Sequence, residues 1–205
     1  MQKCTVALLL LSLFILSSCF PGIPPEKAPQ THYYTLSYDP ASLDKEKLPY
    51  VINILDFSQG PHCDTQKMVF SRKKTSKEHY YYHRWRAEPA ELLTYFLRRD
   101  LRENKIFTAV TGPGFNKPCT HQLEGTVEEF EEVDRNGSSY ARAQINVTLL
   151  KCNQRDISKR VLVQKTYRIK KAMPSKKPAQ LARAMSQVMA ELSRQLAKDI
   201  YELVK

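Results

Sequence analysis

The sequence predicts an α+β fold: a single domain in which a mainly antiparallel sheet carries two amphipathic helices. Short runs of alternating apolar and polar residues fill most of the chain after residue 32, which is typical of strands. Two longer segments repeat apolar residues at the three- and four-residue steps of a helix. Asn136-Gly137, a pair that tolerates positive φ, predicts a hairpin turn between the two longest runs.

Four strands are expected before the first helix. Their residues are aromatic, β-branched or alternating, and they lie at 33–36, 50–55, 67–72 and 79–84. The second of these is apolar on both faces, which indicates a strand inside the sheet. A charged loop is expected over residues 72–78.

The first helix is expected to begin at Pro89, where the missing N–H of proline costs nothing and the acidic Glu88 favours the helix dipole. Its apolar face consists of Leu92, Leu93, Phe96, Leu97 and Leu101. A strand over 106–110 follows it.

Three longer strands are expected at 122–133, 140–150 and 160–169, as a meander. The first carries a row of acids that we expect on its solvent-facing side: Glu124, Glu128, Glu129, Glu131 and Glu132. After Pro178, apolar residues from Leu181 to Leu203 recur at helical spacing and predict a long amphipathic helix.

The amino terminus has the pattern of a bacterial lipoprotein signal. Lys3 precedes an apolar run from Val6 to Leu16, which is shorter than a membrane-spanning helix requires. Leu16-Ser17-Ser18-Cys19 then forms a lipobox, so cleavage is expected between Ser18 and Cys19, with a diacylglyceryl and an N-acyl lipid on Cys19. The alternative is an ordinary secretory signal with an incidental cysteine.

The predicted organisation is therefore a signal peptide over 1–18, a proline-rich tether over 19–31 and a folded domain over 32–205. Acyl chains would anchor the domain to a membrane. The residue after Cys19 is Phe20 and not aspartate, which favours the periplasmic face of the outer membrane.

Three cysteines remain in the expected mature domain. Cys63, Cys119 and Cys152 allow one disulfide and one free thiol in an oxidising periplasm. Cys119 and Cys152 both lie at ends of strand-like runs and are candidates for the pair, although the sequence does not settle the pairing.

The chain carries a formal net charge of +11, which falls to +10 when Lys3 leaves with the signal. The cations gather between Lys151 and Lys177. An exported lipoprotein does not meet nucleic acid in the periplasm, so the expected partners are anionic lipid head groups or an acidic protein face, unless the charges are only solvated.

Enzyme signatures are missing from the sequence. It contains no phosphate-binding glycine-rich loop and no Gly-x-Ser-x-Gly elbow. His79, His83 and the neighbouring Glu78 are the nearest approach to a metal site, and His62-Cys63-Asp64 resembles a catalytic trio only on paper, since adjacent residues do not readily adopt that geometry. No catalytic, cofactor or metal residue is therefore predicted.

The mature chain resembles the ABC-type transport auxiliary lipoprotein family, which includes the paraquat-inducible protein C type. The similarity is carried by a series of segments and by the closing helix: 33–36, 61–72, 82–89, 97–101, 107–110 and 123–127 with Phe130. Their order after a lipobox is more specific than any one of them.

The resemblance implies an outer-membrane lipoprotein that serves an ABC system with Mce-type proteins, which moves lipid between the two membranes. It would be non-catalytic and would dock the periplasmic conduit. Tyr82, Arg84 and Trp85 are candidate partner contacts, because such residues dominate interface energetics; Trp85 could instead be a core residue. The alternatives are an assembly lipoprotein of another outer-membrane machine and a periplasmic hydrolase with an unrecognised site.

Overall fold

The sheet is organised around one long strand, β7 (His121–Arg135), which pairs over its whole length with β8 (Ser138–Lys151). β8 pairs in turn with β9 (Val161–Met173), and both ladders are antiparallel. The computed structural model describes residues 28–73, 75–114, 118–135 and 137–205, and Thr31–Lys205 form one compact unit. Gly137, with φ of 77°, lies in the turn between β7 and β8, and Asn136 lies outside the described residues.

The other edge of β7 pairs with three short strands in succession. These are β2 (Leu48–Ile54), β3 (Ser58–Gln59) and β4 (Lys67–Lys73), and all three run parallel to β7. β2 also pairs with β6 (Phe107–Thr111), while β4 pairs with β5 (Ser76–Trp85), which pairs with β1 (His32–Tyr34). The sheet therefore follows the order β1-β5-β4-β7-β2-β6, with β8 and β9 attached through β7.

The predicted α+β class is confirmed, and the longest ladders are antiparallel as expected. The sheet is nevertheless mixed, because the short ladders along β7 and those of β1 with β5 and β2 with β6 are parallel. The position of β2 inside the sheet is confirmed. The loop predicted over 72–78 is wrong: β4 continues to Lys73, which pairs with Ser76, the first residue of β5.

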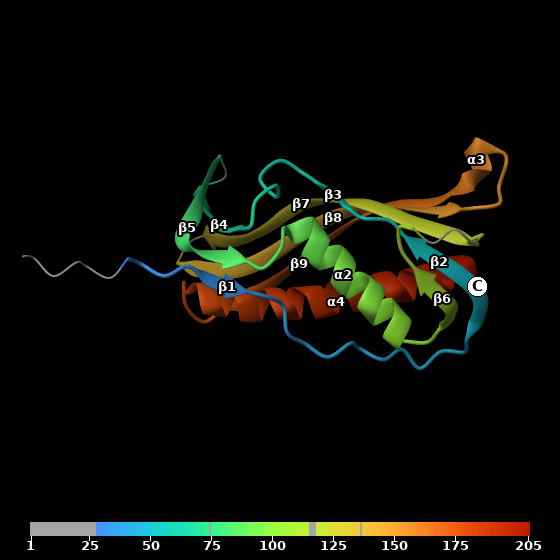
Figure 1. Ribbon diagram of the computed structural model, residues 1–205, viewed down its shortest axis with the longest axis horizontal. Coiled ribbons are helices and arrows are strands. Elements are labelled where there is room, and N and C mark those ends of the chain that lie inside the picture. Colours follow the sequence, from blue (N-terminus) through green and yellow to red (C-terminus); the bar gives the residue numbers. More distant parts are fainter. Residues whose placement is uncertain (1–27, 74, 115–117, 136) are drawn as a thin grey trace, which may run out of the picture. The chain divides into compact units, whose positions relative to one another are not determined.

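Two helices cover one face of the sheet, α2 (Pro89–Glu103) and α4 (Pro178–Val204) (Figure 1). Their predicted apolar faces form the core against the buried side chains of β7 and β8. The fully buried residues include Leu93, Leu97, Leu101, Leu123, Ile145, Leu149, Leu181, Met185, Val188 and Leu192. All buried apolar residues of the described chain lie between Leu36 and Val204, so residues 31–205 contain a complete core of their own. A short helix that the sequence analysis did not expect, α3 (Ile157–Arg160), lies between β8 and β9.

A bulge in β7 changes which side chains face the core. The pairing with β8 shifts between Val127 and Glu129, so the alternation before the bulge is reversed after it. Glu132 then pairs with the buried Ala141 and is itself buried. Glu131 faces the other way and is buried as well, in a place discussed below. The prediction that the whole glutamate row lies on a solvent-facing side is therefore wrong for these two residues.

Candidate docking surface

Three exposed tyrosines lie together at one end of the sheet. Tyr81 and Tyr82 are on β5, with 86% and 47% of their surface exposed, and Tyr33 is on the neighbouring strand β1. β1 runs parallel to β5, with Tyr33 opposite Arg84. Figure 1 shows both strands at the same end of the domain. We call Tyr33, Tyr81, Tyr82 and Arg84 the aromatic edge.

Ring contacts hold β1 in place. His32 stacks on His83 with 5.3 Å between the ring centroids, and the Tyr34 hydroxyl lies 3.0 Å from Nδ1 of His83. Burial, and then the charge of His32, lower the pKa of His83, so this ring is neutral at neutral pH. A strand of three residues thus gains side-chain contacts beyond its short backbone ladder.

Trp85 belongs to the core and not to this surface. Its side chain is 1% exposed and packs edge-on against Phe130, with 5.2 Å between the centroids. Its backbone N–H donates to the carbonyl of Gln66 at 2.7 Å, at the junction between β5 and α2. The interpretation of Trp85 as a partner contact is therefore wrong, because its side chain is buried in the core against Phe130 of β7. Tyr82 is exposed and Arg84 is half-buried.

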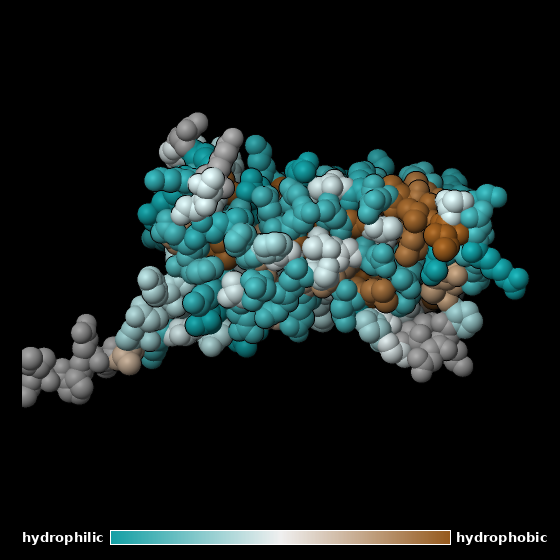
Figure 2. All heavy atoms as spheres, turned by 90° about the horizontal axis from the view of Figure 1, so that it is seen from above, coloured by the Kyte–Doolittle hydropathy of each residue, from teal (hydrophilic) through white to brown (hydrophobic). Residues whose placement is uncertain are grey.

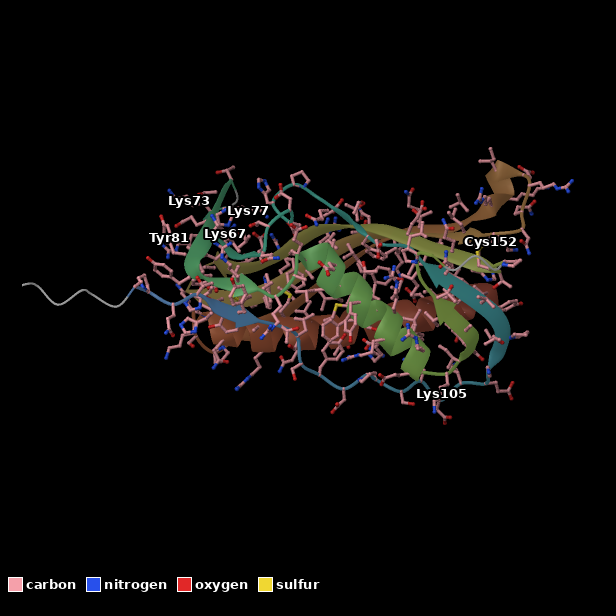
Figure 3. All side chains as sticks on the ribbon, viewed as in Figure 1. Lys67, Lys73, Lys77, Tyr81, Lys105 and Cys152 are labelled. Carbon is pink, nitrogen blue, oxygen red and sulfur yellow. A yellow bond between two sulfur atoms is a disulfide. The ribbon has the colours of Figure 1, made fainter. Side chains whose placement is uncertain are left out.

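Positive charge surrounds the aromatic edge. Lys67 and Arg84 lie opposite each other on β4 and β5, an arrangement of like charges that costs stability in isolation. Figure 3 shows Tyr81 at the same end as Lys67 and Lys73. Among the described residues, no carboxylate lies within ion-pair distance of Lys67, Lys73 or Arg84. The edge therefore offers aromatic rings beside cations that have no acidic partner in this part of the chain.

Two buried glutamates join the edge to β7. Glu131 accepts from Arg142 at 2.7 Å and lies 2.9 Å from Nζ of Lys77 on β5. Glu132 accepts a hydrogen bond from the Tyr80 hydroxyl at 2.7 Å. Burial raises the pKa of Glu132, although the Tyr80 bond opposes the shift. Polar contacts with two buried acids thus join β5 to β7, two strands that do not pair directly.

The cysteines divide into one pair and one free thiol among the described residues. Cys119 and Cys152 form a disulfide, with their Cα atoms 5.9 Å apart, which joins the chain before β7 to the chain after β8. Cys63 is buried near Lys77 and Glu131, and burial raises its pKa to about 11. Its thiol therefore stays protonated and is a poor nucleophile.

The residues considered for catalysis and metal binding do not assemble. Cys63 is buried while His62 beside it is exposed, with a positive φ of 74°. Burial lowers the pKa values of His79 and His83. Within the described ranges, no three histidine, cysteine or acidic side chains come together as metal ligands.

The residues predicted to carry the lipid anchor lie outside the described part of the chain. Ser18, Cys19 and the predicted signal peptide fall outside the described residues, as does most of the predicted tether. No helix in the described part of the chain is both long enough and apolar enough to cross a bilayer.

The basic stretch is partly neutralised within the domain. Lys165 on β9 forms an ion pair with Asp199 of α4, and Lys176 forms one with Asp134 of β7. These two pairs neutralise part of the charge of the stretch within the domain. The cations around α3 are treated separately below.

Residues 34–197 match the family of ABC-type transport auxiliary lipoprotein components. The matched range begins in β1, contains all of β5 and ends inside α4. The chain belongs to this family. It is thus an auxiliary lipoprotein of ABC-type transport, as its sequence suggested.

Solved structures share the fold of this auxiliary lipoprotein. The protein XCC0632 from Xanthomonas campestris is 15% identical, with a TM-score of 0.76 over 84% of this chain and 96% of its own. The hypothetical protein CT253 from Chlamydia trachomatis is 9% identical, with a TM-score of 0.57 over 77% of this chain and 98% of its own. No curated protein matches the chain by sequence.

Proposed function

We propose that this auxiliary lipoprotein is anchored through acylated Cys19 to the periplasmic face of the outer membrane, where it docks the periplasmic conduit of an Mce-type lipid-transport system. It works without catalysis and binds neither nucleotide nor nucleic acid. The aromatic edge is its contact with the Mce-type protein. The family match and the lipobox support the first part, and the exposed tyrosines beside unpaired cations support the second.

The exposure of Tyr81 carries the docking proposal. A tyrosine with 86% of its surface in water contributes little to the stability of the domain, whereas tyrosine and arginine supply much of the binding energy of protein interfaces. The lysines around it favour a partner that presents acidic groups. The tether permits such contact: His32 lies 13 positions after Cys19 (32 − 19), which is at most about 45 Å of extended chain.

Site-specific photocrosslinking in intact cells tests the docking surface. A photoreactive residue at Tyr81 or Tyr82 should capture an Mce-type protein, and one at Tyr95, which is exposed on α2 away from the edge, should not. Tyr81→Ser with Tyr82→Ser should weaken binding to the purified Mce-type protein about tenfold or more without unfolding the domain. Capture of an outer-membrane barrel protein would favour the assembly lipoprotein, and equal capture at Tyr95 would remove the edge from the proposal.

The anchor has its own test. Mass spectrometry of the mature protein should show an acylated cysteine as its first residue. Cys19→Ser should abolish both the acyl mass and the cleavage before residue 19. An unmodified or longer amino terminus on the native protein would contradict the anchor and would leave the fold and the family untouched.

A further inference from the structure

A second exposed apolar surface lies at the other end of the sheet, around α3. We call residues 153–161, which join β8 to β9, the α3 tip. Ile157 is 80% exposed and Val161 is 47% exposed. Val161 lies opposite the half-buried Leu150 of β8, which extends the apolar surface. Figure 2 shows hydrophobic surface gathered toward this end of the domain.

A helix cap and a disulfide hold the α3 tip in the conformation that leaves Ile157 exposed. Asp156 caps α3, since its carboxylate accepts from the backbone N–H of Ser158 at 3.0 Å and from the Ser158 hydroxyl at 2.7 Å. The disulfide at Cys152 fixes the start of the segment to the chain before β7, and Cys152 N–H also donates to the Thr120 carbonyl. The apolar side chain is thus presented by a stapled and capped turn.

Cations surround this apolar tip. Residues 151–161 contain Lys151, Arg155, Lys159 and Arg160 against a single acid, Asp156, a net charge of +3 (4 − 1). Lys159 lies 3.6 Å from that acid, and the described residues hold no ionic partner for Lys151 or Arg155. At the surface of an anionic membrane, phosphate groups lie above the acyl chains. Exposed aliphatic side chains among cations suit such a surface, because the cations can bind phosphates while the aliphatic groups contact acyl chains.

The direction in which the α3 tip projects also favours a membrane as its partner. Figure 1 shows α3 projecting from the sheet on the side opposite α2 and α4. A domain that rests on a membrane through this side keeps its helices away from the lipid. The long strands β7 and β9 span roughly 45 Å, at about 3.3 Å a residue. The predicted 13-residue tether has a similar reach. A domain anchored at Cys19 can therefore lie along the surface and bring the tip to it.

We propose that the α3 tip is a membrane-contact element, which inserts Ile157 and Val161 among the head groups of an anionic phospholipid bilayer while the surrounding cations bind the phosphates. This contact lies beyond the docking role of the aromatic edge and leaves that edge free for a protein partner. The lipid anchor supplies proximity only, so the contact can be measured without it.

Vesicle binding by residues 31–205, which lack the acylated cysteine and contain the whole core, tests the proposal. The fragment should bind vesicles of phosphatidylcholine with about a third phosphatidylglycerol, and bind phosphatidylcholine alone at least tenfold more weakly, because each cation near an anionic surface contributes roughly a fivefold factor. Added salt should weaken the binding. No preference for the anionic vesicles would overturn the proposal.

Paired variants identify the element. Ile157→Ser with Val161→Ser should lower binding about tenfold, from the loss of partly buried apolar surface. Arg155→Glu with Lys159→Glu should lower it at least about twentyfold. The matched charge control is Arg183→Glu with Lys198→Glu on α4, which reverses two exposed cations on the helical side. Tyr95→Ser on α2 is the control for the loss of an exposed apolar side chain. Equal losses in the control variants would show a general charge effect and overturn the assignment, as would a photoreactive residue at 157 that captures protein and no lipid in cells.

Discussion

The aromatic edge and the α3 tip lie at opposite ends of the domain, and each exposes aromatic or aliphatic side chains. The interactions that hold the two surfaces in place differ. At the aromatic edge, β5 is held by buried carboxylates, with Glu131 bound to Lys77 and Arg142. At the α3 tip, the chain is held by the covalent Cys119–Cys152 bond. The stability of the aromatic edge thus depends on the ionisation and pairing of carboxylates, whereas that of the α3 tip depends on the oxidation of two cysteines. The difference means that each surface can be weakened without direct change to the other.

Removing the disulfide should have the largest effect on stability. Cys119→Ala with Cys152→Ala opens a loop of 33 residues, which the chain-entropy relation values at roughly 4 kcal/mol in the free energy of unfolding. Urea denaturation measures the loss. Cys63→Ala, which removes a buried thiol but no bond, is the control and should cost about 1 kcal/mol. If the double variant lost no more free energy of unfolding than this control, the α3 tip would not depend on the disulfide.

Glu131→Gln should weaken the other end by about 3 kcal/mol, because it removes a buried carboxylate from between Arg142 and Lys77 and leaves Lys77 without an acidic partner among the described residues. Glu129 provides the matched control. It binds the same Arg142 at 2.8 Å, but its side chain is 25% exposed against 1% for Glu131. Glu129→Gln should therefore cost less than about 1 kcal/mol. Equal costs would show that burial does not distinguish the two acids.

Much of this architecture could be predicted from the sequence. The helices α2 and α4 follow the periodicity of their leucines, and the long meander follows the alternation in β8. Such patterns report which side of an element is apolar. They do not report which elements pair, and the parallel ladders along β7 were accordingly missed.

The errors at the site have local causes. Glu132 looked solvated because a strand without a bulge would alternate regularly from Leu123 and Val127, whereas one extra residue between Val127 and Glu129 turns Glu132 toward the core. Glu131 faces away from the core, and its burial beside Lys77 and Arg142 depends on neighbouring strands that a single strand's pattern does not report. Trp85 follows the exposed Tyr81 and Tyr82 closely in the sequence, and the residue that packs against its ring, Phe130, lies on β7, far away along the chain. The α3 tip was missed because four residues are too few for a periodic signal.

The smallest expected effect concerns pH at the aromatic edge. Burial raises the pKa of Glu132 above its ordinary value of 4.5, so the folded chain binds this proton more tightly than the unfolded chain does. The contribution of Glu132 to stability is therefore greatest below its unfolded pKa and falls as pH rises through its folded pKa. Glutamine keeps an acceptor for Tyr80 but does not ionise.

Glu132→Gln should thus resemble the native chain at acidic pH and become relatively more stable toward neutral pH. Urea denaturation across that range measures the difference between the two proteins. Tyr80→Phe, which removes the donor that stabilises the ionised carboxylate, should steepen the dependence of the native chain. A difference between Glu132→Gln and the native chain that stays constant with pH would show that this carboxyl does not titrate differently on folding, and the aromatic edge would then owe its stability to ion pairing at Glu131 without a contribution from protonation.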